Sequence, residues 1–337
     1  MLIMLGILLF VVLPGAVVAG IARSVYLEYR PDRIPILLYH RLLSQADAEA
    51  GRVPDEEMIW TSYDTSFAEQ MAYLHREGYT TLDFDDYLSI RAGQMPMPAK
   101  PVMVTFDDGY LSTYLMGFPV LKHYGHKATV FVALEPDQHT ARQVAGFDGF
   151  VSAEQIRSMS DDGISIQSHT LTHCILTELD DEAVGHELNE SRRRLMEITG
   201  RPVDHIAIPR AGHSRRIRRL VKEAGYRTAC CNNKGSANGR SDPLALPRMV
   251  IERDMSIEDF AACLRPRAGV TLRIIGGLKR IPERVGGARF ARRVRDILYV
   301  RPLRPIFRTR SLKKLVALAG VLYLAGAALF VWRLVAS

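Results

Sequence analysis

Several features are scarce or absent in this sequence, and each absence argues against a class of protein. Only four of the 337 residues are cysteines, and they lack the spacing of a disulfide-stabilised secreted domain. They are Cys174, Cys230, Cys231 and Cys263, and they fit a reducing compartment. Repeats and low-complexity tracts are also absent, which argues against a solenoid or a fibrous protein. The hydrophobic fraction of 47% is enough for one large domain or two small ones.

Excess positive charge is absent from most of the chain. Residues 265–314 hold 16 of the 44 Lys and Arg residues but only two of the 37 acids, a local net charge of +14. The remainder has a net charge of −7. A basic segment beside a membrane helix is typical of binding to anionic lipid headgroups. No recognised nucleic-acid module accompanies the charge, so nucleic acid is not expected as a partner.

Two uncharged apolar runs lie near the ends of the chain, at residues 1–22 and 315–332. Eighteen helical residues span about 27 Å, close to the thickness of the bilayer core. The sequence therefore predicts transmembrane helices at 1–22 and 315–333. The first run could instead be a signal peptide, because Ala16–Ala19 offers small residues near a cleavage point. It lacks a Lys/Arg-rich start, however, so an uncleaved anchor is expected.

Basic residues flank the central part of the chain on both sides. They are Arg23, Arg30 and Arg33 after the first run, and Arg308, Arg310, Lys313 and Lys314 before the second. The positive-inside rule therefore predicts an integral protein of a bacterial-type inner membrane, with its central domain on the cytoplasmic face.

Apolar strand patterns alternate with helical patterns between residues 34 and 264. Strands are expected at 36–40, 101–106, 128–132, 164–167, 206–208 and 227–231, with helices between most of them. This alternation predicts an α/β fold with parallel strands, and about seven such units would make a barrel. Residues 42–63 are expected to form a polar loop. Asp83–Tyr87 resembles the acidic motif described next, but it precedes an amphipathic segment, so its acids are expected to start a helix.

Two adjacent carboxylates, Asp107 and Asp108, follow the apolar strand at 101–106, and Gly109 permits a sharp turn after them. Catalytic groups collect at the carboxyl ends of strands in such folds. One acid can bind a metal ion while the other stays free as a base. A solvated Asp-Asp-Gly turn is the alternative for this stretch taken alone.

A second polar motif, Ser168–His173, follows the strand at 164–167. His169 and His173 would reach one point if the segment turned helically. With one carboxylate they form a donor set that leaves positions open for water and substrate. Zinc fits these donors, although cobalt or another divalent ion would too. Cys174 adjoins the set and is a weaker ligand candidate.

Together, Thr105–Gly109 and Ser168–His173 resemble the first two motifs of the NodB-type polysaccharide deacetylases, carbohydrate esterase family four. The resemblance covers residues 34–264. It implies a distorted (β/α)7 barrel and metal-dependent removal of an acyl group from a sugar. By position, Asp107 would be the general base, and Asp108, His169 and His173 would bind the metal.

The remaining site candidates come from the same resemblance. The family's leaving-group acid is a histidine in a Leu-x-His pattern on the last strand, but no histidine follows His213 here. Leu38-Tyr39-His40 carries that pattern at the start, which resembles the circularly permuted branch and makes His40 the general-acid candidate. The family's third motif is reduced to Pro209 and Arg210, where the Arg210 backbone could bind the oxyanion; its side chain is a candidate contact for Asp107 or a substrate phosphate. Tyr110, Pro209 and His213 are candidate substrate contacts, and His213 is also a second candidate acid.

The sequence thus predicts a membrane-anchored, metal-dependent deacetylase of N-acetylated sugars. Cytoplasmic topology and the basic segment 265–314 favour a lipid-linked sugar as substrate. Apolar residues among those arginines are typical of interfacial helices, which would hold a lipid carrier at the barrel mouth or only anchor the domain. One alternative is an extracytoplasmic deacetylase of exopolysaccharide or peptidoglycan. Another is a non-catalytic sugar-binding barrel, which the intact acid and histidine set argues against.

Overall fold

A computed structural model describes residues 13–279 except 52, 54–59, 137–147, 232–234 and 254. The chain forms two compact units, one of residues 25–272 and one of residues 1–24 with 273–337. The predicted deacetylase domain, 34–264, lies inside the first unit. Of the second unit, only parts of helices α2 (Leu13–Glu28) and α12 (Pro266–Lys279) are described.

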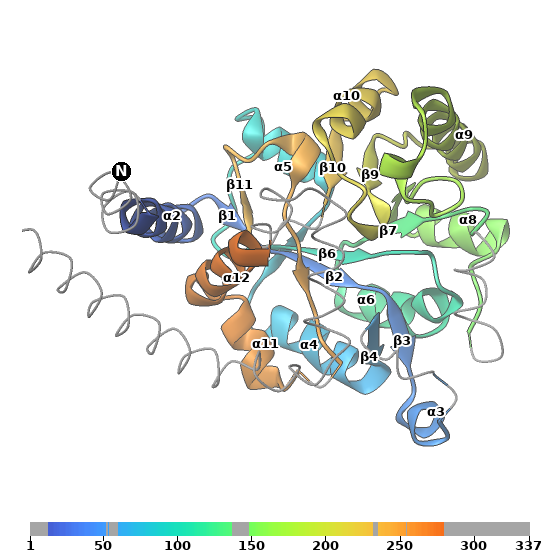
Figure 1. The fold of residues 1–337 in the computed structure, drawn as a ribbon. Coiled ribbons are helices and arrows are strands. Elements are labelled where there is room, and N and C mark those ends of the chain that lie inside the picture. The colour runs from blue at the N-terminus through green and yellow to red at the C-terminus, as the bar shows by residue number, and fades with distance from the viewer. Residues whose placement is uncertain are drawn as a thin grey trace, which may run out of the picture. The chain divides into compact units, whose positions relative to one another are not determined.

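A curled sheet of parallel strands forms the centre of the first unit (Figure 1). Its strand order is β10-β9-β8-β7-β6-β2-β12, and β5 also pairs with β6. All of these pairings are parallel. The strands are β2 (Ile36–Tyr39), β5 (Thr80–Leu82), β6 (Pro101–Phe106), β7 (Thr129–Val132), β8 (Ser165–Ser168), β9 (His205–Ala207), β10 (Thr228–Cys230) and β12 (Met249–Val250). The predicted α/β class is therefore confirmed.

The segment from Leu246 to Ile251 joins the two edges of this sheet. At its start, the backbone N–H of Leu246 donates to Ala229 O at 2.9 Å, beside β10. At its end, the N–H of Ile251 donates to Leu38 O at 3.0 Å, on β2. The same six-residue stretch thus bonds to β10, at one edge of the sheet, and to β2 near the other edge, and the sheet curls on itself.

The helices follow the strands as the alternation predicts. They are α4 (Asp64–Arg76), α5 (Phe84–Arg91), a π-helical turn η3 (Thr113–Gly117), α6 (Phe118–Tyr124), α8 (Ala153–Asp161), α9 (Asp181–Thr199), α10 (Arg215–Glu223) and α11 (Ile257–Cys263). Ser152 and Asp180 cap α8 and α9 by accepting from backbone N–H groups in the first turn. Gly125 and Gly200 end α6 and α9 in the left-handed conformation, which glycine adopts without steric cost.

The loop expected at residues 42–63 contains more structure than predicted. Strands β3 (Arg41–Leu43) and β4 (Thr61–Tyr63) pair in parallel, and a short helix α3 (Gln45–Glu49) follows β3. Strands β1 (Arg33–Ile34) and β11 (Ala237–Asn238) also pair, antiparallel, before β2. Such strands of two or three residues are too short to give a sequence period.

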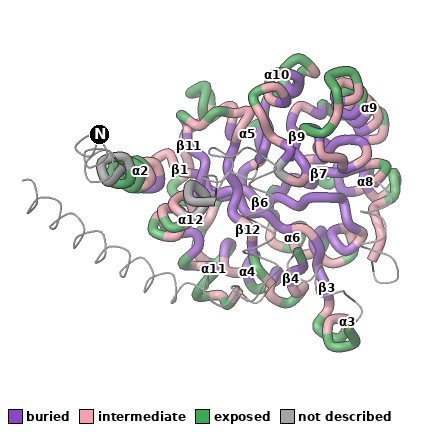
Figure 2. Tube along the Cα trace, viewed as in Figure 1, coloured by how far each residue is buried: buried purple, intermediate pink, exposed green. Residues whose placement is uncertain are grey.

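Both faces of the sheet are buried, as Figure 2 shows along the central strands. On β6, Val102, Val104 and Phe106 belong to one hydrophobic cluster, which includes residues of the surrounding helices. Met103 belongs to a second cluster with Phe84 and Tyr87 of α5. Alternate residues of a strand point to opposite faces, so Thr105 and Asp107 continue the Met103 face.

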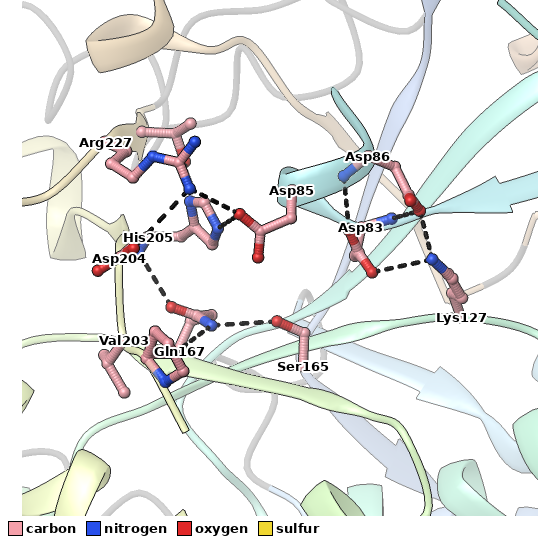
Figure 3. Close-up of polar contacts among 12 residues, drawn as sticks. Asp83, Asp85, Asp86, Lys127, Ser165, Gln167, Val203, Asp204, His205 and Arg227 are labelled. Atoms are coloured by element: carbon pink, nitrogen blue, oxygen red, sulfur yellow. Dashed lines mark hydrogen bonds and ion pairs between the residues drawn. The ribbon is translucent and has the colours of Figure 1, made fainter. Parts of the chain in front are cut away.

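Helix α5 lies at the amino ends of the strands, where Figure 3 shows its acids. Asp83 and Asp86 form a capping box, which confirms the prediction that these acids start a helix. Both accept from Nζ of Lys127, two residues before β7. Asp85 contacts His205, the first residue of β9. Asp107, Asp108 and the histidine motif, in contrast, follow the carboxyl ends of their strands.

The predicted membrane helices are not confirmed. None of the helices in the described part of the chain combines the length and the apolarity needed to cross a bilayer. Residues 1–12 of the first predicted helix, and all of 315–333, lie outside the described residues. Most of the basic segment 265–314 lies outside them too.

Candidate active site

Asp107 and Asp108 sit directly after β6, at the point where the strand ends. The N–H of Asp107 still donates to Tyr39 O at 3.0 Å, continuing the pairing of β6 with β2. Asp108 has φ 73°, a left-handed conformation that costs a non-glycine residue energy. Gly109 follows with φ 76°. This turn breaks the strand alternation, and both carboxylates lie at the same buried end of the sheet.

The histidine segment after β8 does not turn helically as expected. Thr170 and His173 have φ values of 65° and 62°, outside the helical region. Side chains hold this conformation: the N–H of His173 donates to Oγ1 of Thr170 at 3.1 Å. Glu187 of α9 accepts from the N–H groups of Leu171 and Thr172, each at 2.9 Å. It also accepts from the Thr172 hydroxyl at 2.7 Å. Glu187 is thus the main polar support of the loop that carries both histidines.

The structure brings Asp108, His169 and His173 together, with one ligand atom of each within 4.8 Å of the others. Oδ1 of Asp108 lies 3.3 Å from Nε2 of His169 and 3.1 Å from Nε2 of His173. Nδ1 of His169 lies 2.8 Å from the carbonyl oxygen of Ala207. A carbonyl can only accept, so Nδ1 carries the hydrogen and the neutral ring turns the Nε2 lone pair toward Asp108.

This donor set fits a divalent metal ion. Oδ1 of Asp108 is buried and accepts no hydrogen bond from the described residues. One carboxylate oxygen and two imidazole nitrogens therefore face one another in a buried space, an arrangement that a cation stabilises. Two imidazoles and a carboxylate are ligands that zinc accepts, and other divalent ions bind them too.

Asp107 is held by a residue that the sequence did not single out, Arg248. Its two terminal nitrogens donate to the two carboxylate oxygens at 2.6 and 2.7 Å. Both side chains are nearly fully buried. Burial alone would raise the pKa of Asp107, but the Arg248 guanidinium lowers it below its ordinary value. Asp107 is therefore ionised and fixed in orientation at neutral pH.

Arg248 lies in the closing segment, directly before β12. Arg248 makes the contact with Asp107 for which the Arg210 side chain was a candidate. One sequence signal for this role was available. Arg248 stands inside the otherwise apolar run from Leu246 to Ile251, and an arginine buried in such a run requires an acidic partner.

His40 follows β2, the strand that lies between β6 and β12. Its ring packs against the exposed ring of Trp60 at a centroid distance of 4.9 Å. Burial lowers the pKa of His40, while the charges of Asp108 and Asp107 act in the opposite direction. Tyr39 pairs with Phe106, so His40 and Asp107 are the next residues along two neighbouring strands, at the same end of the sheet.

The other predicted site residues lie around this centre. Tyr110 is buried, with its ring 4.4 Å from the Arg41 guanidinium and 5.5 Å from the ring of Phe150. Pro209 is buried and starts a short turn after β9, in which Arg210 has φ 50°. His213 is half-buried beyond that turn. The roles assigned to these residues stay predictions.

Known proteins share this fold and site region. A model of the polysaccharide deacetylase family matches residues 94–229. YxkH of Bacillus subtilis (strain 168), assigned to the polysaccharide deacetylases, is 30% identical over 234 residues, 69% of this chain and 76% of its own length.

Two solved structures are similar as well. The deacetylase PplD of Streptococcus pyogenes, solved with acetate, is 24% identical with a TM-score of 0.61, covering 70% of this chain and all of its own. BC0361, a polysaccharide deacetylase of Bacillus cereus, is 27% identical with a TM-score of 0.57, covering 69% of each chain. The chain described here therefore belongs to the polysaccharide deacetylase family.

Proposed function

We propose that this protein is a membrane-anchored, metal-dependent hydrolase that removes the N-acetyl group from an amino sugar of an envelope glycan. The observation that carries the proposal is the pair of unlike carboxylates after β6. Asp107 is held by Arg248, and Asp108 faces His169 and His173. One acid is thereby kept as a base while its neighbour completes a ligand set.

Asp108, His169 and His173 would hold the metal ion. Bound there, a divalent ion supplies Lewis acidity, which activates water and polarises the acyl carbonyl. Asp107 accepts the proton of the attacking water, and its lowered pKa keeps it ready to do so at neutral pH. Arg248 keeps both Asp107 oxygens in place during this transfer, since it binds them with two parallel hydrogen bonds.

His40 would protonate the leaving nitrogen. An amide nitrogen is too poor a leaving group to depart without a proton, so amide hydrolysis needs an acid at this position. His40 lies at the end of β2, next to the strand that carries Asp107. Burial lowers its pKa, which makes the protonated ring a better proton donor. Trp60, against the same ring, offers an exposed aromatic face on which a sugar can pack.

Charge along the chain supports anchoring at the inner membrane with the catalytic domain on the cytoplasmic face. The basic segment 265–314 would bind anionic lipids. Under this topology a lipid-linked glycan is the first substrate to test. An alkaline-phosphatase fusion at the C-terminus should be active, because that terminus would lie across the membrane. An inactive fusion, with a protease-accessible central domain, would favour the second candidate, an extracytoplasmic deacetylase of exopolysaccharide or peptidoglycan.

A direct test is to incubate the purified full-length protein with defined lipid-linked and polymeric N-acetyl sugars and to measure released acetate. The proposal predicts metal-dependent acetate release that Asp107→Asn abolishes. Acetate release that persists unchanged in this variant would contradict the mechanism. No acetate from any N-acetyl sugar, with metal bound, would contradict the reaction itself.

A further inference from the structure

The end of the barrel opposite the active site carries a surface that the proposed reaction does not use. Its position follows from the strands. The contacts of Asp83, Asp85 and Asp86 with Lys127, Arg227 and His205 lie where strands begin, as Figure 3 shows for these side chains. The active-site residues lie where strands end. β6 alone has six residues, so the two ends are separated by roughly 20 Å at about 3.3 Å per residue.

Tyrosines and arginines gather on the same amino-terminal end. Arg91 of α5 donates to the carbonyls on either side of Arg240, and Arg33, just before β2, donates to the carbonyl of Arg265. We define a tyrosine–arginine rim by Tyr26, Tyr29, Arg240, Arg265 and Arg267, all of which are exposed. Tyr26 and Tyr29 have exposed fractions of 55% and 61%, unusually high for large aromatic residues.

The side chains of Tyr26 and Arg240 are in contact although they are far apart in the chain. The Tyr26 hydroxyl accepts from Arg30 at 2.9 Å and from Arg240 at 3.5 Å. Asp32 accepts from Arg30 and from the N–H of Gly239, so it is already engaged. The rim therefore presents aromatic rings and guanidinium groups together.

A buried ion pair, Glu28–Arg33, holds the first and the last segments of the domain together beside this rim. Glu28, the last residue of α2, is fully buried and accepts from Arg33 at 2.9 Å and from the N–H of Ser236 at 2.8 Å. Arg33 in turn donates to the carbonyl of Leu264 at 2.7 Å, just before α12. A methyl group at Gly269 of α12 would overlap the Glu28 carboxylate as it is placed, so Gly269 lets the helix pack closely on this ion pair. The chain thus enters and leaves the barrel unit at one place.

Tyrosine and arginine are the residues that collect at a membrane–water interface, where each ring spans the boundary and each cation meets anionic headgroups. The sequences that continue from this rim support a bilayer as the partner. Residues 1–22 are apolar and uncharged, and residues 265–314 carry a net charge of +14.

We propose that the tyrosine–arginine rim rests on the headgroups of an anionic bilayer, so that the active site opens on the membrane-distal end. The inference rests on the proposed function, and it narrows the substrate class. A sugar attached directly to a lipid phosphate would lie at the wrong end of the barrel. The site would instead reach sugars that stand roughly 20 Å from the headgroups, as in a polymer or in a lipid-linked chain of several sugars.

The test places a fluorophore at either end of the full-length protein in bilayers of phosphatidylcholine and phosphatidylglycerol in equal parts. Cys174→Ser first removes the half-buried native thiol. Arg240→Cys then labels the rim, and Thr177→Cys labels the 3-10 helical turn η4 (Leu176–Glu178) that follows His173. Arg267→Cys and Glu154→Cys give a second pair at exposed positions, in case one variant folds poorly. Quenching by headgroup-labelled nitroxide lipid is the readout.

We expect strong quenching at positions 240 and 267 and none above the lipid-free control at positions 177 and 154. Equal quenching at both ends, quenching confined to 177 and 154, or none at any position would overturn the proposal. Acetate release from a soluble N-acetyl sugar is measured on the same samples. Retained acetate release with the wrong quenching pattern overturns the orientation alone, whereas missing acetate release in the unlabelled wild-type protein, which keeps Cys174, overturns the proposed function.

Discussion

Arg248 offers the sharpest test of how Asp107, the proposed base, is positioned. Arg248→Lys keeps the charge but replaces a planar fork with a single ammonium, so one of the two hydrogen bonds to Asp107 is lost. A hydrogen bond to a charged group contributes about 1.5–3 kcal/mol. If that loss falls on the transition state, kcat/KM should drop roughly 10- to 150-fold. Acetate release at saturating zinc measures it, and Arg253→Lys in the same region is the matched control.

Arg248→Met should have a larger effect on stability, because it leaves Asp107 as a buried carboxylate without its cation. Breaking a buried ion pair in this way costs about 3–5 kcal/mol. For a domain of this size the melting temperature should fall by roughly 6–20 °C. In the Asp107→Asn background the same substitution should cost much less, since no charge is left unpaired. Wild-type kcat/KM in Arg248→Lys, or additive stability losses in the double variant, would refute the assignment.

Three further predictions concern the rest of the site. His40→Ala should lower kcat for amide substrates roughly 10²- to 10⁴-fold while the affinity for zinc is unchanged, as kinetics and calorimetry would show. Removal of metal by a chelator should abolish acetate release. Zinc or cobalt, added back at a limiting concentration, should restore the release in the wild type but not in His173→Ala. Glu187→Ala should weaken metal affinity about 10- to 100-fold, because the loop carrying the histidines loses its support.

Each of these predictions has an outcome that contradicts it. Unchanged turnover in His40→Ala would move the acid role to His213, and His213→Ala tests that directly. Full activity after chelation, with no metal detected in the protein, would exclude the metal role of His173. Glu190→Ala, at a half-buried position on the same helix as Glu187, is the control for general damage to α9. If both substitutions weaken metal binding equally, Glu187 has no special role.

The strands and helices that position the site could be predicted because their signals are local. The apolar run before Asp107, the capping residue Ser152 and the left-handed Gly200 each act within a few residues of the chain. The metal candidates were found for the same reason, since each motif follows one strand. Their geometry was predicted less well: positive φ at Thr170 and His173 depends on Glu187, which lies on a separate helix.

Arg248 could not be paired with Asp107 from the sequence, because 141 residues separate them. The contact arises when the segment from Leu246 to Ile251 closes the curled sheet. β12 has only two residues, too few for a recognisable strand pattern. The sequence analysis named Arg210 as a candidate contact for Asp107 and did not consider this long-range partner. Long-range pairing is set by tertiary packing, which local propensity does not encode.

The central claim is that adjacent carboxylates have different tasks, Asp108 in holding the metal and Asp107 in removing a proton. Zinc titration by calorimetry, combined with the acetate assay on Asp107→Asn and Asp108→Asn, tests it most directly. The account predicts that Asp107→Asn still binds one zinc ion tightly yet releases no acetate, whereas Asp108→Asn loses zinc affinity and activity together. Loss of zinc binding in Asp107→Asn, or its retention in Asp108→Asn, would contradict the account.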